Sequence, residues 1–223
     1  MKISVLQFPG TNCEYDTKYA FEQLGCEVEI IWHKEKNIPE DTDLLVIPGG
    51  FSYGDYLRSG AIARFATIMD SVQAYAAKGG KVLGICNGFQ ILLEAGLLPG
   101  AMKRNDSLHF ISKYHTLKVV DNDNAFLSLL KKDEVLNIPV AHHDGNYYID
   151  SLGLKDLEEN GQILLKYCDN NGSVVNMNGS VSNIAGICNK EKNVFGLMPH
   201  PERAIEELLG STDGINMLKG FLQ

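Results

Sequence analysis

Short apolar runs alternate with longer segments of helical periodicity over the first half of the chain. The runs cover residues 3–8, 28–32, 44–47 and 81–85, and they carry apolar side chains on both faces. Runs of this length and composition are typical of strands buried in a parallel sheet. The pattern therefore predicts an α/β fold with a mostly parallel central sheet and helices on both faces.

The segments between these runs predict the helices. After the first strand, Thr11 or Asn12 is expected to cap a helix, whose apolar positions include Tyr15, Tyr19, Phe21 and Leu24. Over residues 62–76, apolar side chains recur at steps of three and four, which predicts one helix of roughly five turns. A further helix is expected to begin near Phe89 and to end at Gly96.

The pattern changes in the second half of the chain. From about residue 112, alternating segments such as 115–120 are separated by turns such as 169–172, which predicts additional antiparallel strands. Two more helices are expected, over residues 204–209 and 214–222. Because no segment resembles a linker or a repeat, we expect a single domain over residues 1–223.

Composition narrows the class of protein. Of the 223 residues, 44% are hydrophobic, which is enough for a sizeable core. Lys and Arg number 20 against 28 Asp and Glu, and the cationic residues form no cluster, which argues against a nucleic-acid partner. The amino terminus lacks a signal-peptide pattern, and no apolar run approaches the ~20 residues that span a bilayer. We expect a cytoplasmic protein without a membrane partner.

The five cysteines do not predict a disulfide framework or a zinc site, because their number is odd and no Cys-X-X-Cys occurs. Cys13, Cys26 and Cys188 are expected to be small buried hydrophobic residues. Cys86 differs, since it stands between a strand and a helix with Gly84 and Gly88 on either side.

Gly-X-Cys-X-Gly at a strand-to-helix junction is the thiol counterpart of the Gly-X-Ser-X-Gly nucleophile elbow. The turn is tight, so side chains two residues before and after the nucleophile would collide with neighbouring backbone. The start of a helix also favours a thiolate and offers N–H donors to an oxyanion. The pattern indicates a reactive Cys86, and the alternative is a structural βα turn that carries a cysteine by coincidence.

A reactive thiol needs a base, and His200 is the candidate among the six histidines. It follows an apolar strand and stands between Pro199 and Pro201, which restrict the backbone. In extended geometry Glu202 lies on the same face and could bind the far ring nitrogen, so that Cys86, His200 and Glu202 form a relay. The alternative is a rigid proline loop with a solvated histidine and a surface pair of Glu202 and Arg203.

The adjacent histidines His142 and His143 do not predict a metal site. Neighbouring residues on a strand point to opposite faces, and no other ligand pair has a matching spacing. One of the two imidazoles could still line the site.

With these motifs in place, the sequence resembles the class I, or triad, glutamine amidotransferases. More narrowly, it is similar to the glutaminase subunits of phosphoribosylformylglycinamidine synthase, which act in purine synthesis. The resemblance covers nearly the whole chain and is carried by residues 8–13, 47–63, 84–90, 96–101 and 198–204. It departs at residues 141–145, where Ala-His-His-Asp-Gly replaces the Ala-His-Gly-Glu-Gly of the family.

The resemblance implies a flavodoxin-like fold and assigns roles to several residues. Cys86 would attack the glutamine side-chain amide, His200 would move protons, and Glu202 would orient His200. The backbone N–H groups of Gly50 and Asn87 would form the oxyanion hole. Phe51 and Gln90 would contact the glutamine substrate.

The resemblance also implies partners. It points to a separate synthetase subunit that binds ATP and Mg²⁺, with a small bridging subunit, and to no cofactor or metal in this chain. The sequence is consistent with this division, since it contains no phosphate-binding Gly-X-X-X-X-Gly-Lys-[Ser/Thr]. Two alternatives remain: a cysteine hydrolase or stress protein on the same fold, and a non-catalytic module that regulates a partner.

Overall fold

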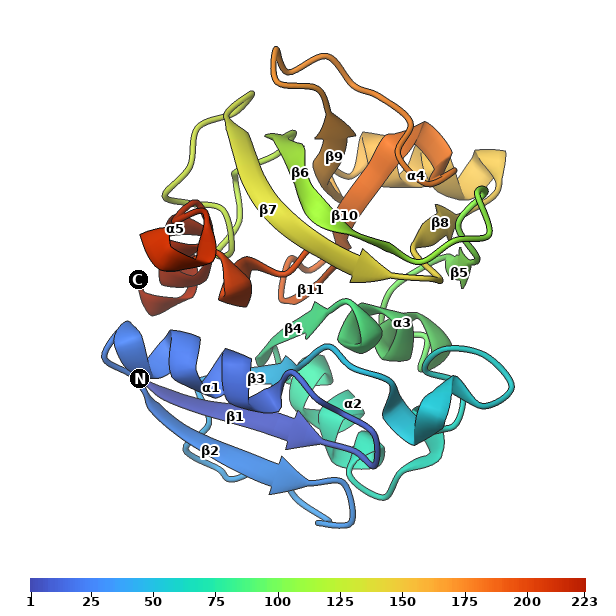
Figure 1. The fold of residues 1–223 in the computed structure, drawn as a ribbon. Coiled ribbons are helices and arrows are strands. Elements are labelled where there is room, and N and C mark those ends of the chain that lie inside the picture. The colour runs from blue at the N-terminus through green and yellow to red at the C-terminus, as the bar shows by residue number, and fades with distance from the viewer.

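The computed structural model describes residues 1–223, and its centre is one nine-stranded mixed sheet (Figure 1). The first five strands in the sheet order run parallel: β2 (Glu27–Trp32), β1 (Lys2–Gln7), β3 (Leu44–Ile47), β4 (Lys81–Ile85) and β11 (Val194–Leu197). The other four join by antiparallel pairing: β10 (Ile184–Cys188), β9 (Ile163–Cys168), β6 (Ile111–Val119) and β7 (Val135–His142). The predicted fold class is confirmed, and the antiparallel strands extend the same sheet.

Five α-helices lie around this sheet: α1 (Glu14–Gln23), α2 (Met69–Ala77), α3 (Asn87–Glu94), α4 (Ser151–Glu159) and α5 (Gly214–Lys219) (Figure 1). A small second sheet pairs β5 (Ala101–Lys103) with β8 (Asn146–Tyr148). The buried apolar side chains of the main sheet and its helices form one contiguous cluster. Folding thus buries both faces of β1, β3, β4 and β11, as their apolar sequences require, whereas the edge strand β2 is only partly buried.

The parallel half of the sheet positions the candidate site. Strands β1, β3, β4 and β11 are neighbours that run in the same direction, so their carboxyl ends meet at one edge. Cys13, Gly50, Cys86 and His200 all follow the ends of these strands. Residues from four distant parts of the sequence therefore come together, as is usual for ligand sites in open α/β sheets.

Two predictions about the first helix are wrong in detail. The cap position of α1 is occupied by Cys13 and not by Thr11 or Asn12. No side chain forms a capping hydrogen bond with this helix. The Thr11 hydroxyl instead accepts a hydrogen bond from the Phe8 N–H at 3.0 Å. Tyr15 and Tyr19 are 66% and 45% exposed, and the helix buries the face that carries Phe21.

The predicted five-turn helix over residues 62–76 is interrupted. A short 3₁₀ turn covers Ala63–Phe65, the backbone is extended at Ala66, and α2 begins only at Met69. The break lets Arg64 donate to the Glu94 carbonyl at 3.2 Å and leaves Phe65 exposed.

Near the carboxyl terminus, residues 204–209 contain only the 3₁₀ turn Glu207–Leu209 in place of the predicted helix. Glu206 instead forms an isolated antiparallel β-bridge with Ser211. The helix expected over residues 214–222 is present as α5, followed by a 3₁₀ turn. Helix α4, capped by the Asp150 side chain, was not predicted.

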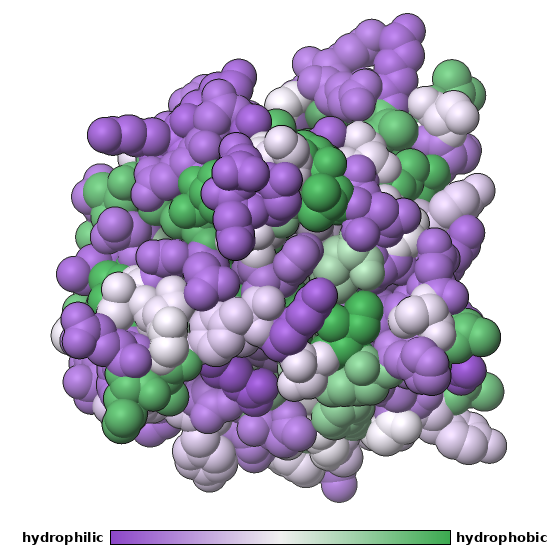
Figure 2. All heavy atoms as spheres, turned by 45° about the horizontal axis from the view of Figure 1, so that its top comes forward, coloured by the Kyte–Doolittle hydropathy of each residue, from purple (hydrophilic) through white to green (hydrophobic).

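The surface shown in Figure 2 is largely hydrophilic, with apolar side chains in separate patches. No helix combines the length and the hydropathy that crossing a bilayer would require.

Candidate active site

Cys86 occupies a strained turn between β4 and α3. Its backbone has φ 51° and ψ −104°, a combination that non-glycine residues rarely adopt, and it is the cap residue of α3. A Cβ atom at Gly88 would lie 1.8 Å from the carbonyl oxygen of Ile47, and one at Gly84 would lie 2.8 Å from the backbone of Gly88. The two glycines are therefore required by close backbone approach, as the elbow motif predicts.

His200 and Glu202 form a buried pair beside this turn. The Nδ1 atom of His200 lies 2.7 Å from Oε1 of Glu202, and the two residues are 1% and 2% exposed. The other ring nitrogen, Nε2, is buried without a hydrogen-bond partner. Burial alone would lower the pKa of His200, but the charges of Glu202 and Cys86 raise it to about 10. The alternative of a solvated histidine with a surface Glu202 is wrong.

Cys86 and His200 both line a small pocket of about 160 Å³, so the thiol and the imidazole belong to the same pocket. Gly50 and Phe51 lie on its wall, and Ala141 approaches from β7, with its carbonyl 3.6 Å from the Cys86 sulfur. Gly50 has φ 141°, a conformation that favours glycine.

The two backbone donors expected to form an oxyanion hole are both available. Neither the Gly50 N–H nor the Asn87 N–H donates to a backbone carbonyl. Asn87 is the first residue of α3, where N–H groups lack partners within the helix and the helix dipole favours negative charge. An oxyanion hole formed by these two N–H groups stays a prediction.

The two expected substrate contacts differ in placement. Phe51 is 42% exposed and lines the pocket. Gln90 is 5% exposed and does not line it, because its amide is engaged by the protein. Gln90 Nε2 donates to the Asp144 carbonyl at 2.6 Å, and its Oε1 accepts from Asn87 at 2.8 Å. A substrate contact through Gln90 stays a prediction.

Cys13 and Arg203 are parts of the site that sequence reasoning missed. Cys13 is 2% exposed, as expected for a buried cysteine, but it lines the same pocket as Cys86. Its sulfur lies 3.0 Å from Nη2 of Arg203, whose Nε donates to Asp16 at 3.0 Å. Burial, and then the charge of Glu202, raise the pKa of Cys13. The sequence feature that could have indicated a place for Cys13 in the site is its position shortly after the first strand of the chain.

One cluster has ligand atoms close enough for a metal ion: those of Cys13, His200 and Glu202 lie within 4.8 Å of one another. Two features oppose a cation there. His200 and Glu202 already bind each other, and the Arg203 guanidinium places a positive charge 3.0 Å from the Cys13 sulfur.

The neighbouring imidazoles His142 and His143 point apart, as alternation along a strand predicts. His142 is buried with Nδ1 3.1 Å from Asn105, whereas His143 reaches the Leu108 carbonyl at 3.2 Å on the exposed side. Burial lowers the pKa of His142 to about 4, so it is neutral near pH 7. Neither imidazole lines the pocket that contains Cys86.

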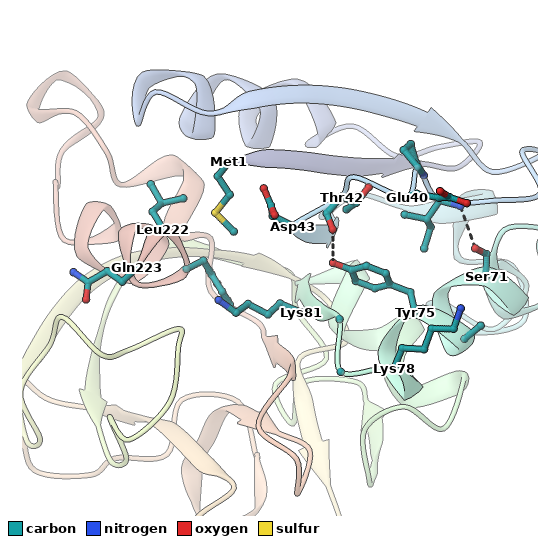
Figure 3. Close-up of a pocket in the computed structure, with 16 residues that line it drawn as sticks. Met1, Glu40, Thr42, Asp43, Ser71, Tyr75, Lys78, Lys81, Leu222 and Gln223 are labelled. Carbon is teal, nitrogen blue, oxygen red and sulfur yellow. Dashed lines mark hydrogen bonds between the residues drawn. The ribbon is translucent and has the colours of Figure 1, made fainter.

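A larger cavity of about 850 Å³ lies at the opposite edge of the sheet (Figure 3). It is bounded by Met1, Asp43 and Lys81 at the amino ends of three strands, and Tyr75 donates there to the Thr42 carbonyl at 3.1 Å. Its lining contains no cysteine or histidine. This cavity is therefore separate from the thiol site.

The chain's similarity to known proteins agrees with this geometry. Residues 1–214 match the family model of the CobB/CobQ-like glutamine amidotransferase domain. The chain is 68% identical to phosphoribosylformylglycinamidine synthase subunit PurQ of Sulfurimonas denitrificans, over 100% of both chains. It is 63% identical to the protein of the same name from Wolinella succinogenes, over 99% of both.

A solved structure gives the same result in three dimensions. The structure of PurLQS from Thermotoga maritima matches 99% of this chain and 97% of its own chain, with 42% identity and a TM-score of 0.90. The fold is thus that of a class I glutamine amidotransferase. Within that class, the chain belongs to the family of PurQ subunits of phosphoribosylformylglycinamidine synthase.

Proposed function

We propose that the chain is the glutaminase subunit of a phosphoribosylformylglycinamidine synthase. It hydrolyses glutamine to glutamate and ammonia and delivers the ammonia to a synthetase subunit for purine synthesis. The observation that carries the proposal is the buried His200–Glu202 pair, joined at 2.7 Å, on the pocket that contains Cys86.

In the first half-reaction the Cys86 sulfur attacks the side-chain amide carbon of glutamine. The carbonyl oxygen becomes an oxyanion, which accepts hydrogen bonds from the N–H groups of Gly50 and Asn87. His200, whose raised pKa favours the imidazolium form, gives a proton to the amide nitrogen. The carbon–nitrogen bond then breaks. Ammonia is released, and the γ-glutamyl group stays bound to Cys86 as a thioester.

In the second half-reaction water attacks the thioester. His200, now neutral, accepts the proton of that water, and the carbon–sulfur bond breaks to release glutamate and the thiolate. Glu202 holds Nδ1 throughout, so that Nε2 stays directed at the reacting atoms. The proton that His200 gives in the first step is thereby recovered in the second.

The alternatives fit the site less well. A cysteine hydrolase or stress protein on this fold would not need a histidine and a carboxylate in the segment that follows the neighbouring strand β11. A regulatory module without activity would not need to bury His200 and Glu202 together, because burial costs charged groups their hydration. The intact arrangement of Cys86, His200 and Glu202 favours catalysis over both.

The product implies a partner. Ammonia released into neutral water is protonated and loses its nucleophilicity, so its use requires a nearby acceptor site. We infer assembly with a synthetase subunit that binds ATP and Mg²⁺ and with a small bridging subunit, in the cytoplasm. Similarity to PurQ proteins and to a PurLQS structure supports this assembly.

Glutamine turnover is expected to be weak for the chain alone and to rise strongly when the synthetase subunit is added. Equal rates of turnover with and without that subunit would contradict the coupling.

Labelling with a glutamine-like electrophile tests the nucleophile. The full chain is incubated with the reagent, and the modified peptide is identified by mass spectrometry. We expect the label on Cys86 and its loss in Cys86→Ala, while Cys13→Ala serves as the matched control for the second thiol of the pocket. A label on Cys13 or Cys168 in place of Cys86 would overturn the proposed function.

A further inference from the structure

A buried side-chain amide joins the two backbone segments that carry the oxyanion donors. Asn87 is 1% exposed, and its Oδ1 accepts the N–H of Ser52 at 3.0 Å. Its Nδ2 donates to Gln90 at 2.8 Å and to the Asp55 carboxylate at 3.3 Å. The amide thus uses both donors and binds the loop after β3 to the start of α3.

We propose that Asn87 and Asp55 are positioning residues whose side chains hold the two arms of the oxyanion hole at a fixed separation. The inference rests on the function proposed above and adds residues to it. One arm is the Gly50 N–H, two residues before the bound Ser52, and the other is the backbone N–H of Asn87 itself. Stabilisation of an oxyanion requires both donors within about 3 Å of one point, and a displacement near 1 Å can cost about 10²-fold in rate.

The loop needs such a restraint because its backbone is strained. Tyr53, Asp55 and Leu57 have φ values of 53°, 53° and 70°, in the left-handed region that non-glycine residues seldom occupy. Strain of this kind persists only where the surroundings hold it, and it concentrates at functional sites. Tyr53 is held by His33, with its hydroxyl 2.9 Å from Nδ1, and Asp55 is held by Asn87.

A second set of hydrogen bonds closes the arrangement into a ring. The Ser59 hydroxyl donates to the Asp144 carboxylate at 2.8 Å, and the Asp144 carbonyl accepts from Gln90 at 2.6 Å. Gln90 in turn accepts from Asn87. The ring therefore runs from Ser59 of the loop through Asp144 and Gln90 to Asn87, which binds the loop again at Ser52 and Asp55. This explains why the Gln90 amide binds protein groups.

The position of Asp55 is hard to explain by stability alone. Burial raises the pKa of its carboxyl to about 6, and the nearby charge of Asp144 raises it as well. A carboxylate placed against another carboxylate in a partly buried site costs free energy. This cost is consistent with selection for the orientation of Asn87.

Kinetics of the full chain test the proposal. In Asp55→Ala the acceptor for Asn87 is lost, and we expect kcat for glutamine hydrolysis to fall by about 10-fold to 10²-fold with little change in KM. Asp55→Asn keeps an acceptor oxygen and is expected to retain most of kcat. Alkylation of Cys86 by iodoacetamide needs no oxyanion hole, so its rate should stay unchanged in both variants.

Tyr56→Ala is the matched control, because this side chain is in the same loop and 71% exposed. An unchanged kcat in Asp55→Ala would overturn the proposal. So would equal losses in Asp55→Ala and Asp55→Asn, or a loss of kcat matched by slower alkylation, which would indicate general disruption.

Hydrogen exchange tests the restraint without reference to activity. We expect the amides of residues 50–55 to exchange at least about tenfold faster in Asn87→Ala than in the unmodified chain, because Ser52 loses its acceptor. Unchanged exchange would overturn the proposal. If the unmodified chain hydrolysed no glutamine even in complex with the synthetase subunit, the proposed function would fail, while this comparison would still decide whether Asn87 holds the loop.

Discussion

At the scale of single residues, the proposed mechanism depends on the contact between His200 and Glu202, and both side chains are buried. A carboxylate 2.7 Å from Nδ1 fixes the tautomer of the imidazole and leaves Nε2 for the reacting atoms. In a site from which water is excluded, the attraction between opposite charges is stronger than at the surface. We therefore expect changes to this pair to affect both catalysis and stability.

The catalytic roles predict an order of losses. Cys86→Ala is expected to abolish glutamine turnover, and His200→Ala is expected to reduce it almost as far. Glu202→Ala is expected to retain more activity, with a loss of roughly 10²-fold, because an orienting group contributes less than the group it orients. Steady-state kinetics of the three variants provide the test, and a Glu202 variant as inactive as the Cys86 variant would show that its role is larger.

The raised pKa of His200 predicts a pH dependence of stability. The folded-state pKa of about 10 exceeds the ordinary value of 6.5 for a free histidine. His200 thus contributes its full stabilisation below about pH 6.5, and this contribution is lost as the pH rises through about 10. Urea denaturation should show that the difference in free energy of unfolding between the unmodified chain and His200→Gln shrinks over this range. A difference that grows with pH would contradict the assigned interaction.

At the scale of elements, the junction between β4 and α3 depends on two glycines for steric reasons. Gly88 stands where any Cβ would meet the Ile47 carbonyl of the neighbouring strand β3. The turn therefore couples the nucleophile to the packing of α3 on the sheet.

Gly88→Ala is expected to reduce the free energy of unfolding by roughly 1–3 kcal/mol, because the added methyl group forces the backbone apart. Gly54→Ala is a useful comparison, since a Cβ there meets no atom within 4 Å, although its φ of 67° adds strain of its own. Thermal or urea unfolding measures both variants. A Gly88→Ala protein as stable as the unmodified chain would mean that the turn can relax.

Strands were more predictable from the sequence than helices. Leu44–Ile47 and Lys81–Ile85 were predicted with their observed bounds, because a strand buried on both faces is a continuous apolar run. The prediction of one helix over residues 62–76 was wrong, because periodicity does not reveal that Ala66 is extended and that Arg64 binds the end of α3. Tertiary contacts determine the backbone conformation of that segment.

At the scale of the whole molecule, the order of the strands determines which residues meet. The elbow at Cys86 and the segment His200 to Glu202 could be recognised from their local patterns. The contacts of Arg203 with Cys13 and Asp16 could not, because they join residues 190 and 187 positions apart in sequence. Such contacts exist only because β1 and β11 lie in one sheet and end at the same edge.

Cys86 is expected to form a γ-glutamyl thioester during glutamine hydrolysis. Rapid acid quenching of the chain during turnover, followed by peptide mapping with mass spectrometry, tests it directly. We predict a glutamyl group on Cys86, absent from Cys86→Ala and present in Cys13→Ala. Sustained hydrolysis of glutamine with the group on another residue, or by the Cys86→Ala variant, would contradict the account.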